Sequence, residues 1–275
     1  MNNNAKVTKE NIRGVWHYTY PKDVEMVVVS GDIHGAFREI VNKVAVQYDI
    51  HNALLIVAGD CGFGFEREGY YENIYQRCAK HLKRNNLYVA FVRGNHDNPV
   101  YFSEQLIDKN RWLTLPDYSV VSAASKQILC VGGAISVDRQ YRKITKAFSS
   151  ALHYHGHPAL KPTCYWPDEP IVYNPELLDV VRDEFQIDTV VTHTAPKFCE
   201  MVSHDGLLKL AETDSALLDD VKEERQRASL IYERLKADGH PMKDWIYGHF
   251  HRSWHASIDD TMFSMLDCEE LKQLY

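Results

Sequence analysis

The side chains best suited to chemistry follow short apolar runs, at the points where strands would end and loops begin. Asp32 and His34 follow one run, and Asp60 follows the next. The other polar residues at such points are Asn95, His96, His193, His249 and His251. Carboxylate, imidazole and amide groups form a nitrogen and oxygen ligand set that suits Zn, Fe or Mn. The strand ends therefore predict a metal site.

The spacing within two of these blocks strengthens that prediction. Asp32 and His34 are two residues apart, as are His249 and His251. In extended backbone such pairs point to the same face, so each pair could hold one ion from one side. Taken singly, each block has an ordinary explanation, such as a helix cap for Asp32. Four separate strand ends with metal-type side chains favour a shared site instead.

The elements that must position these residues are six apolar runs. Short continuous runs rich in β-branched and aromatic residues are typical of strands buried on both faces. The runs are "MVVVSGD", "ALLIVAGD", "LYVAFVRGNHD", "QILCVGGAISVD", "TVVTHTAP" and "DWIYGHFH". Helical stripes separate the first three, with apolar residues at steps of three and four between 37 and 48 and between 71 and 82. The alternation predicts an α/β fold.

Two later segments carry further expectations. A helix is predicted from about Ser215 to Lys236, with Leu217, Leu218 and Leu235 facing inward and the charged stretch "KEERQR" facing solvent. The segment from about 141 to 175 is rich in proline, histidine and aromatic residues, which predicts an irregular insertion or lid. Its histidines, in "HYHGHP", could form a third metal site, although exposed loop histidines are the simpler interpretation.

Composition narrows the classes of function. The chain has 275 residues and a net charge of -7, which disfavours a long nucleic-acid partner. Its six cysteines are scattered singly, so we expect free thiols in a reducing compartment. The first residues lack a signal-peptide pattern, and the longest apolar runs are strand-sized. These features predict a cytoplasmic protein without a membrane span.

The order of the blocks resembles that of the calcineurin-like metallophosphoesterase superfamily. The blocks are "GDIHG" at 31–35, "GD" at 59–60, "GNHD" at 94–97, "TH" at 192–193 and "GHFH" at 248–251. The resemblance implies two packed mixed β-sheets flanked by helices, a four-layer α/β/β/α sandwich. It further implies that residues 1–275 form a single domain.

The resemblance also implies roles for individual residues. Asp32, His34 and His251 would hold one metal ion, while Asn95, His193 and His249 would hold a second. Asp60 would bridge the two ions, which would be Mn, Fe or Zn. His96 would face the leaving oxygen as general acid, with Asp97 as a candidate for orienting it.

The implied reaction is hydrolysis of a phosphomonoester or phosphodiester by in-line attack of a metal-bridging hydroxide. Two nearby cations repel each other, so a shared carboxylate such as Asp60 is needed to hold them together. Few carboxylates in the ligand set leave the site net positive, which suits a phosphate ester. The expected partner is a small phosphorylated substrate, with nucleotides among the candidates.

The second block departs from the pattern Gly-Asp-x-x-Asp-Arg of the protein Ser/Thr phosphatases. Phe63 and Gly64 replace the Asp that supports the catalytic histidine and the Arg that binds phosphate. This departure argues against a protein phosphatase of that type and leaves Glu66 or Asp97 to orient His96. Substrate phosphate must then meet other cations, for which the candidates are Arg139 (the first choice), Arg93, Arg142 and Arg252.

Two alternatives remain at this point. A non-catalytic binding scaffold could use the same fold, although a decayed site would normally have lost ligands. A two-metal hydrolase of C–N bonds is also conceivable, but Asn95 and the order of the blocks speak against it.

Overall fold

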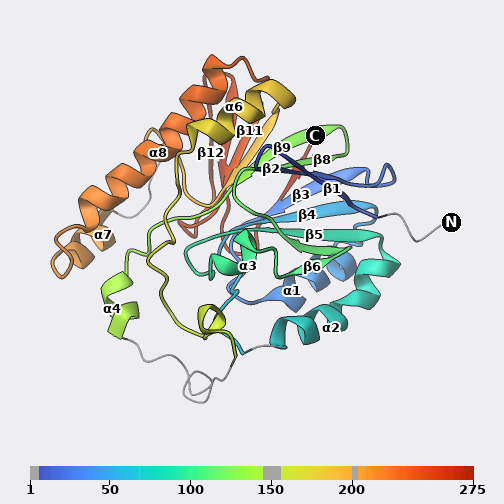
Figure 1. The fold of residues 1–275 in the computed structure, drawn as a ribbon, viewed down its shortest axis with the longest axis horizontal. Coiled ribbons are helices and arrows are strands. Elements are labelled where there is room, and N and C mark those ends of the chain that lie inside the picture. The colour runs from blue at the N-terminus through green and yellow to red at the C-terminus, as the bar shows by residue number, and fades with distance from the viewer. Residues whose placement is uncertain (1–5, 68, 145–155, 200–203) are drawn as a thin grey trace.

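Two β-sheets packed face to face form the centre of the protein (Figure 1). The structure, a computed structural model, describes residues 6–67, 69–144, 156–199 and 204–275. The larger sheet has the strand order β1-β2-β8-β9-β10-β11-β13-β12, and the smaller one β14-β3-β4-β5-β7-β6.

The larger sheet mixes parallel and antiparallel pairs. Its central strands β9, β10, β11 and β13 run parallel to one another, and β12 returns antiparallel to β13. Its strands are β1 Thr8–Ile12, β2 Val15–Thr19, β8 Ser119–Ala123, β9 Lys126–Val131, β10 Thr189–Thr192, β11 Asp244–Tyr247, β12 Trp254–Ile258 and β13 Thr261–Met265.

The smaller sheet has a parallel centre, because β3, β4, β5 and β7 pair in parallel. Its edge strands β14 and β6 are antiparallel to their neighbours. The strands are β3 Met26–Ser30, β4 Ala53–Ala58, β5 Leu87–Val92, β6 Asp108–Lys109, β7 Trp112–Thr114 and β14 Leu271–Leu274.

Helices cover the outer faces of the two sheets. Figure 1 shows α1 and α2 beside the smaller sheet, with α6 and α8 on the opposite side, beside the larger one. The helices are α1 Phe37–Asn42, α2 Tyr70–Arg84, α3 Val100–Ser103, α4 Arg139–Ile144, α6 Pro175–Glu184, α7 His204–Ala211 and α8 Leu217–Ala237. A π-helix, Lys43–Gln47, continues α1, and a 3₁₀ turn spans Pro158–Leu160.

Strand β4 shows why the central strands are apolar throughout. Leu54 and Ile56 pack into the core between the sheets, while Leu55 and Val57 pack against the helices α1 and α2. Side chains alternate between the two faces of a strand, so a strand covered on both faces needs apolar residues at every position. The four-layer arrangement of helices and sheets is therefore confirmed.

All six apolar runs predicted as strands are strands, and they occupy the centres of the sheets. They are β3, β4 and β5 in the smaller sheet and β9, β10 and β11 in the larger one. Each trio is parallel, so within each sheet the carboxyl ends meet at one edge. These are the ends that carry the polar blocks.

The predicted helix near 215–236 is confirmed as α8, but two details of its faces were wrong. Leu218 was expected to face inward and is 41% exposed. The stretch "KEERQR" was expected to face solvent, yet Glu224 and Arg225 are buried. Both find polar partners below the helix, since Glu224 accepts from the Thr194 hydroxyl and Arg225 donates to the Pro196 carbonyl. Charge alone did not reveal this buried polar face.

The described part of the predicted insertion has little regular structure. Residues 156–174 contain only the short turn Pro158–Leu160, and Trp166, Glu169 and Ile171 are buried. His153 and His155 lie outside the described residues, whereas His157 is exposed and accepts a hydrogen bond from the Ala159 amide. None of the described helices has both the length and the apolar character needed to cross a membrane.

Candidate metal centre

A first group of predicted ligands meets where β3, β4 and β11 end. Asp32, His34, Asp60 and His251 each offer one ligand atom, and these atoms lie within 4.8 Å of one another. The Nε2 atoms of His34 and His251 are 3.0 Å apart. Nε2 of His251 lies 3.0 Å from Oδ2 of Asp32, and Nε2 of His34 lies 3.7 Å from it.

This convergence fits a cation. Asp32 is fully buried, and its Oδ2 has no hydrogen-bond partner of normal geometry. A buried, unpartnered carboxylate oxygen is costly, and two imidazole nitrogens that face each other can share either a proton or a bound metal ion. Two nitrogens bound tetrahedrally to one zinc ion would lie about 3.3 Å apart, close to the separation seen here. The donor set therefore fits a divalent metal.

A second group meets at His193, which is completely buried at the end of β10. Its Nδ1 lies 2.8 Å from the Ala58 carbonyl, which can only accept, so Nδ1 carries the proton. Its Nε2 then faces Oδ1 of Asp60 and Oδ1 of Asn95, each at 3.0 Å. Nε2 of His193 thus faces two oxygen atoms that only accept, so either a proton on Nε2 or a bound cation must lie between them.

The electrostatics of His193 support the same conclusion. Burial lowers its pKa, but the charges of Asp60 and Asp32 outweigh that effect and raise the pKa to about 10. The surroundings are thus negative enough to hold a positive charge inside the protein.

Asp60 connects the two groups. Its Oδ1 faces His193, while its Oδ2 lies 3.9 Å from Nδ1 of His34 and 3.8 Å from Nδ1 of His96. Burial raises the pKa of Asp60, but His193, His96 and His34 together hold it well below its usual range. An ionised carboxylate between two sets of nitrogen ligands is the arrangement expected of a bridging ligand.

The position of His249 is less decisive. Its backbone amide donates to Oδ1 of Asp32, and its ring lies 5.0 Å from the ring of His193. Burial holds the pKa of His249 well below its usual range, which keeps the ring neutral, as a ligand must be. Its assignment to the second metal stays a prediction.

The backbone at this site is unusual. His34, Asp60, His249 and His251 all have positive φ angles, between 43° and 71°. Non-glycine residues rarely adopt this conformation outside turns, and it is typical of functional sites when several such residues cluster. These residues lie where β3, β4 and β11 end, beside the two groups of ligand atoms.

Glycines in the blocks make room for the ligands. A Cβ atom on Gly94 would lie 2.0 Å from the backbone nitrogen of Asp60. A Cβ atom on Gly248 would lie 2.1 Å from Oδ1 of Asp32. Neither Asp60 nor Asp32 can move away without displacing a predicted ligand. Only glycine therefore fits at these positions of "GNHD" and "GHFH", because a side chain would collide with the neighbouring aspartate.

Asn95 is oriented by two residues that the sequence did not indicate. Its Nδ2 donates to Oγ of Ser136 at 3.0 Å, and the Ser136 hydroxyl donates to Glu169 at 2.7 Å. Glu169 is buried within the predicted insertion and also accepts from the backbone amide of Ser136. This chain of hydrogen bonds turns Oδ1 of Asn95 towards His193. The signal available was weak, a serine at the end of β9 and a glutamate in an irregular segment.

A family model for calcineurin-like phosphoesterases matches residues 26–253. The chain belongs to the calcineurin-like phosphoesterase family. The matched region covers all five polar blocks, most of the smaller sheet and the strands β8 to β11 of the larger one. This membership makes it one of a family of metal-dependent phosphoesterases.

Solved structures with a similar fold share little sequence with this family member. They include the TT1561 protein of Thermus thermophilus, at 13% identity, 91% coverage of this chain, 98% of that chain and a TM-score of 0.46. The phosphopantetheinyl hydrolase of Mycobacterium tuberculosis is 12% identical, with 92% and 97% coverage and a TM-score of 0.46. A dimetal phosphatase from Danio rerio is 11% identical, with 89% and 88% coverage and a TM-score of 0.44. No curated protein matches the sequence significantly.

The departure from the protein-phosphatase pattern of this calcineurin-like family has a structural cause. Phe63 is fully buried and packs among Phe37, Tyr71 and Phe91, in the core between the smaller sheet and its helices. Its side chain therefore takes part in packing and does not support the histidine of the "GNHD" block as the replaced Asp would.

The contacts of Asp97 favour a different role from the one predicted. Its carboxylate accepts hydrogen bonds of 2.8–3.0 Å from the backbone amides of Cys61, Gly62, Phe63 and Gly94. It thereby ties the glycine-rich loop after Asp60 to the "GNHD" block. Burial and the charge of Asp60 raise the pKa of Asp97 to about 7. Because four backbone donors occupy this carboxylate, it is placed to shape the loop and not to orient the ring of His96.

Two of the four arginines named as candidates for substrate binding, Arg93 and Arg139, have architectural contacts. Arg93 is buried, and its guanidinium donates to Asp117 at 2.8 Å and to the Glu169 carbonyl at 2.6 Å. Arg139 forms short ion pairs with Asp214 and Asp220, both at 2.6 Å. These contacts disfavour the predicted substrate role of both residues. They anchor the segments that carry Glu169 and α4.

Proposed function

We propose that this protein is a metal-dependent phosphoester hydrolase that acts on a small phosphorylated substrate, either a monoester or a diester. The observation that carries the proposal is the sharing of Asp60 between two groups of ligand atoms. In each group the converging nitrogen and oxygen atoms can act as metal ligands, so the arrangement suits two metal ions.

Under this proposal, Asp32, His34 and His251 hold one ion, and Asn95, His193 and His249 hold the other. Asp60 contacts both. When bound, such ions would activate water and offset the negative charge of a phosphoryl group. Mn, Fe and Zn all suit a ligand set of nitrogen and oxygen atoms.

His96 is the proposed general acid. Its backbone amide donates to Oδ1 of Asp60 at 2.7 Å, which fixes the residue beside the metal centre. Its side chain is 27% exposed and lies beside the ring of His34, so a substrate can reach it. Burial lowers the pKa of His96 to about 4 in the protein alone. A phosphate dianion next to the ring would stabilise the imidazolium and raise that pKa, allowing proton donation to the leaving oxygen.

A cavity of about 300 Å³ lies on the His96 side of the site. Its walls include His34 and His96 together with Phe65, Glu66 and Tyr70. This volume would accept a small leaving group, and the aromatic walls suit one with an apolar or aromatic face. Nucleotides and aryl phosphates are therefore the first substrates to test.

The test combines metal analysis with two classes of substrate. His96→Ala should keep both metal ions but lose about 100-fold or more in kcat on esters with poor leaving groups. The loss in kcat on esters with good leaving groups should be much smaller, because the departure of such groups needs little protonation. His51→Ala, at an exposed histidine paired with Asp49, provides a matched control and should behave as wild type.

Two outcomes would count against the proposal. Equal losses on both classes of ester would remove the general-acid role from His96. A protein that holds two metal ions but hydrolyses neither monoesters nor diesters, across nucleotides and other phosphorylated metabolites with Mn, Fe or Zn, would point to the binding-scaffold alternative.

A further inference from the structure

A loop that follows β13 places a cysteine beside the first group of metal ligands. Sγ of Cys268 lies within 4.8 Å of a ligand nitrogen of His34 and of a ligand nitrogen of His251. The other five cysteines are buried, whereas Cys268 is exposed. No motif indicated this proximity, because Cys268 is more than two hundred residues from His34 along the chain.

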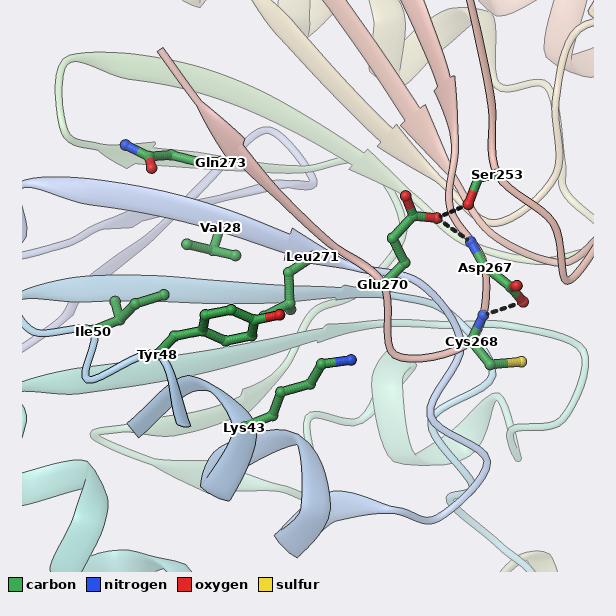
Figure 2. A pocket seen from close by; sticks show the side chains of 10 residues that line it. All are labelled: Val28, Lys43, Tyr48, Ile50, Ser253, Asp267, Cys268, Glu270, Leu271 and Gln273. Atoms are coloured by element: carbon green, nitrogen blue, oxygen red, sulfur yellow. Dashed lines mark hydrogen bonds between the residues drawn. The ribbon is translucent and has the colours of Figure 1, made fainter. Parts of the chain in front are cut away.

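The loop around Cys268 is tied to the backbone of the metal site. The amide of Glu269 donates to the Asp32 carbonyl at 2.9 Å, and the amide of Gly31 donates to the Glu270 carbonyl at 3.0 Å. Hydrogen bonds within the loop, drawn in Figure 2, fix it further: the Asp267 amide donates to the Glu270 carboxylate, and the Cys268 amide donates to Asp267. The position of the thiol is thus coupled to that of Asp32.

A second observation shows that this position faces a cation site. Oδ2 of Asp32 is buried without a hydrogen-bond partner, and the Nε2 atoms of His34 and His251 converge beside it. In a tetrahedral zinc site, sulfur and nitrogen ligands lie about 3.5 Å apart. The thiol of Cys268, which lies within 4.8 Å of these two histidines, would move towards their nitrogens to join the same ion.

We propose that Cys268 binds, as a thiolate, the metal ion held by Asp32, His34, Asp60 and His251. Formation of the sulfur–metal bond displaces the thiol proton to solvent, and no oxidation or reduction is involved. A soft thiolate ligand favours Zn²⁺, Fe²⁺ or Co²⁺ over Mg²⁺ or Mn²⁺ at this position. The inference rests on the proposed metal centre and adds a ligand to it.

Solvent can reach the thiol. Cys268 stands at one end of a cavity of about 500 Å³ between the π-helix and β14 (Figure 2). Ile50 and Gln273 lie towards the other end, with Lys43 and Tyr48 along one side. Because the thiol is accessible, its proton can leave to solvent when the sulfur binds the metal.

The decisive experiment uses cobalt as a spectroscopic probe of the intact chain. Metal-free wild-type protein titrated with Co²⁺ should develop a sulfur-to-cobalt charge-transfer band in the near ultraviolet. Cys268→Ser should bind the same amount of cobalt per chain without that band. Tyr48→Phe alters the same cavity without touching the ligand cluster, and it should keep the band.

Competition between metals gives a second measurement. The preference of the first site for Zn²⁺ over Mn²⁺ should fall roughly 10-fold or more in Cys268→Ser, as expected for loss of a direct ligand. A wild-type protein that binds two cobalt ions without a charge-transfer band overturns the role of Cys268 and leaves the metal centre intact. A wild-type protein that binds no cobalt, zinc or manganese overturns the metal centre and the role of Cys268 together.

Discussion

Hydrogen bonds determine which atom of Asn95 faces the metal centre. An amide side chain can present either oxygen or nitrogen, and only the oxygen binds a metal. The Ser136 hydroxyl donates to the carboxylate of Glu169, so its oxygen is left to accept from Nδ2 of Asn95. Oδ1 of Asn95 then points to His193. Glu169 acts through Ser136 and is a positioning residue for this ligand.

Removing the charge of Glu169 tests this chain of hydrogen bonds. Glu169→Gln can offer Ser136 either a donor or an acceptor, so the orientation of Asn95 is no longer fixed. Partners of this kind typically change metal affinity 10- to 100-fold, and we expect a loss of roughly 10-fold at the second site. Calorimetric titration of metal-free protein would measure it.

The control for this variant is its exposed neighbour, Asp168. Asp168→Asn removes a charge from the same segment without touching Ser136 and should bind metal as wild type does. Unchanged affinity at both sites in Glu169→Gln would show that Asn95 does not depend on this chain of hydrogen bonds.

At the scale of elements, α8 does more than cover a sheet. Its inner face carries Glu224, which is 2% exposed, accepts from the Thr194 hydroxyl and leaves Oε2 without a hydrogen-bond partner. Thr194 follows the ligand His193, so the helix supports the end of β10. Burial raises the pKa of Glu224 to about 7, which means that ionising this carboxyl costs stability in the folded state.

This raised pKa predicts a pH dependence of stability. The folded protein holds the Glu224 proton up to about pH 7, whereas the unfolded chain releases it near its ordinary value of 4.5. The contribution of Glu224 is fully present below pH 4.5 and is lost as the pH rises to about 7. Glu224→Gln cannot ionise, so relative to wild type it should become more stable between about pH 5 and about pH 8, by about 3 kcal/mol at most.

Urea unfolding of the metal-free wild-type and Glu224→Gln proteins at about pH 5 and about pH 8 would measure this difference in the free energy of unfolding. Glu223→Gln changes the exposed neighbour on the same helix and should track wild type at both pH values. If Glu224→Gln loses stability with pH in parallel with wild type, then Glu224 does not ionise in this range.

At the scale of the whole molecule, the proposed metal centre joins the two sheets. Asp32, Asp60 and Asn95 follow strands of the smaller sheet, while His193 and His251 follow strands of the larger one. The sheets otherwise meet through an apolar core that includes Leu54, Tyr88, Ile128 and Val191. Bound metal should therefore stabilise the folded state as a whole, since the unfolded chain cannot assemble this ligand set.

Metal binding should raise the melting temperature. A metal ion at 100 times its Kd adds about 2.7 kcal/mol to the free energy of unfolding, which corresponds to about 5 °C for a chain of this size. Differential scanning calorimetry with Zn²⁺, then with a chelator, would show the gain and its reversal. Asp60→Asn removes the charge of the shared ligand and should lose most of the gain. A melting temperature independent of metal in wild type would contradict a centre that joins the sheets.

Much of the fold was predictable from the sequence because its centre is buried on both faces. The strands β3, β4, β5, β9, β10 and β11 were recognisable as uninterrupted apolar runs, and the polar blocks at their ends named the ligands. The edge strands were missed, since β1 and β14 are partly exposed and short. Exposed strands lack the continuous apolar signal that double burial imposes.

Residue types and their order along the chain determined the family, the layered fold and the candidate ligands. Tertiary structure decided what the remaining polar residues do. Asp97 and Arg93 have the right types for a phosphate site, but close packing gives them backbone and carboxylate partners instead. Glu169 lies far along the chain from Asn95, and Cys268 lies far from His34, so only the fold brings them to the centre. Contacts between distant segments depend on how the sheets and loops pack, which local sequence pattern does not encode.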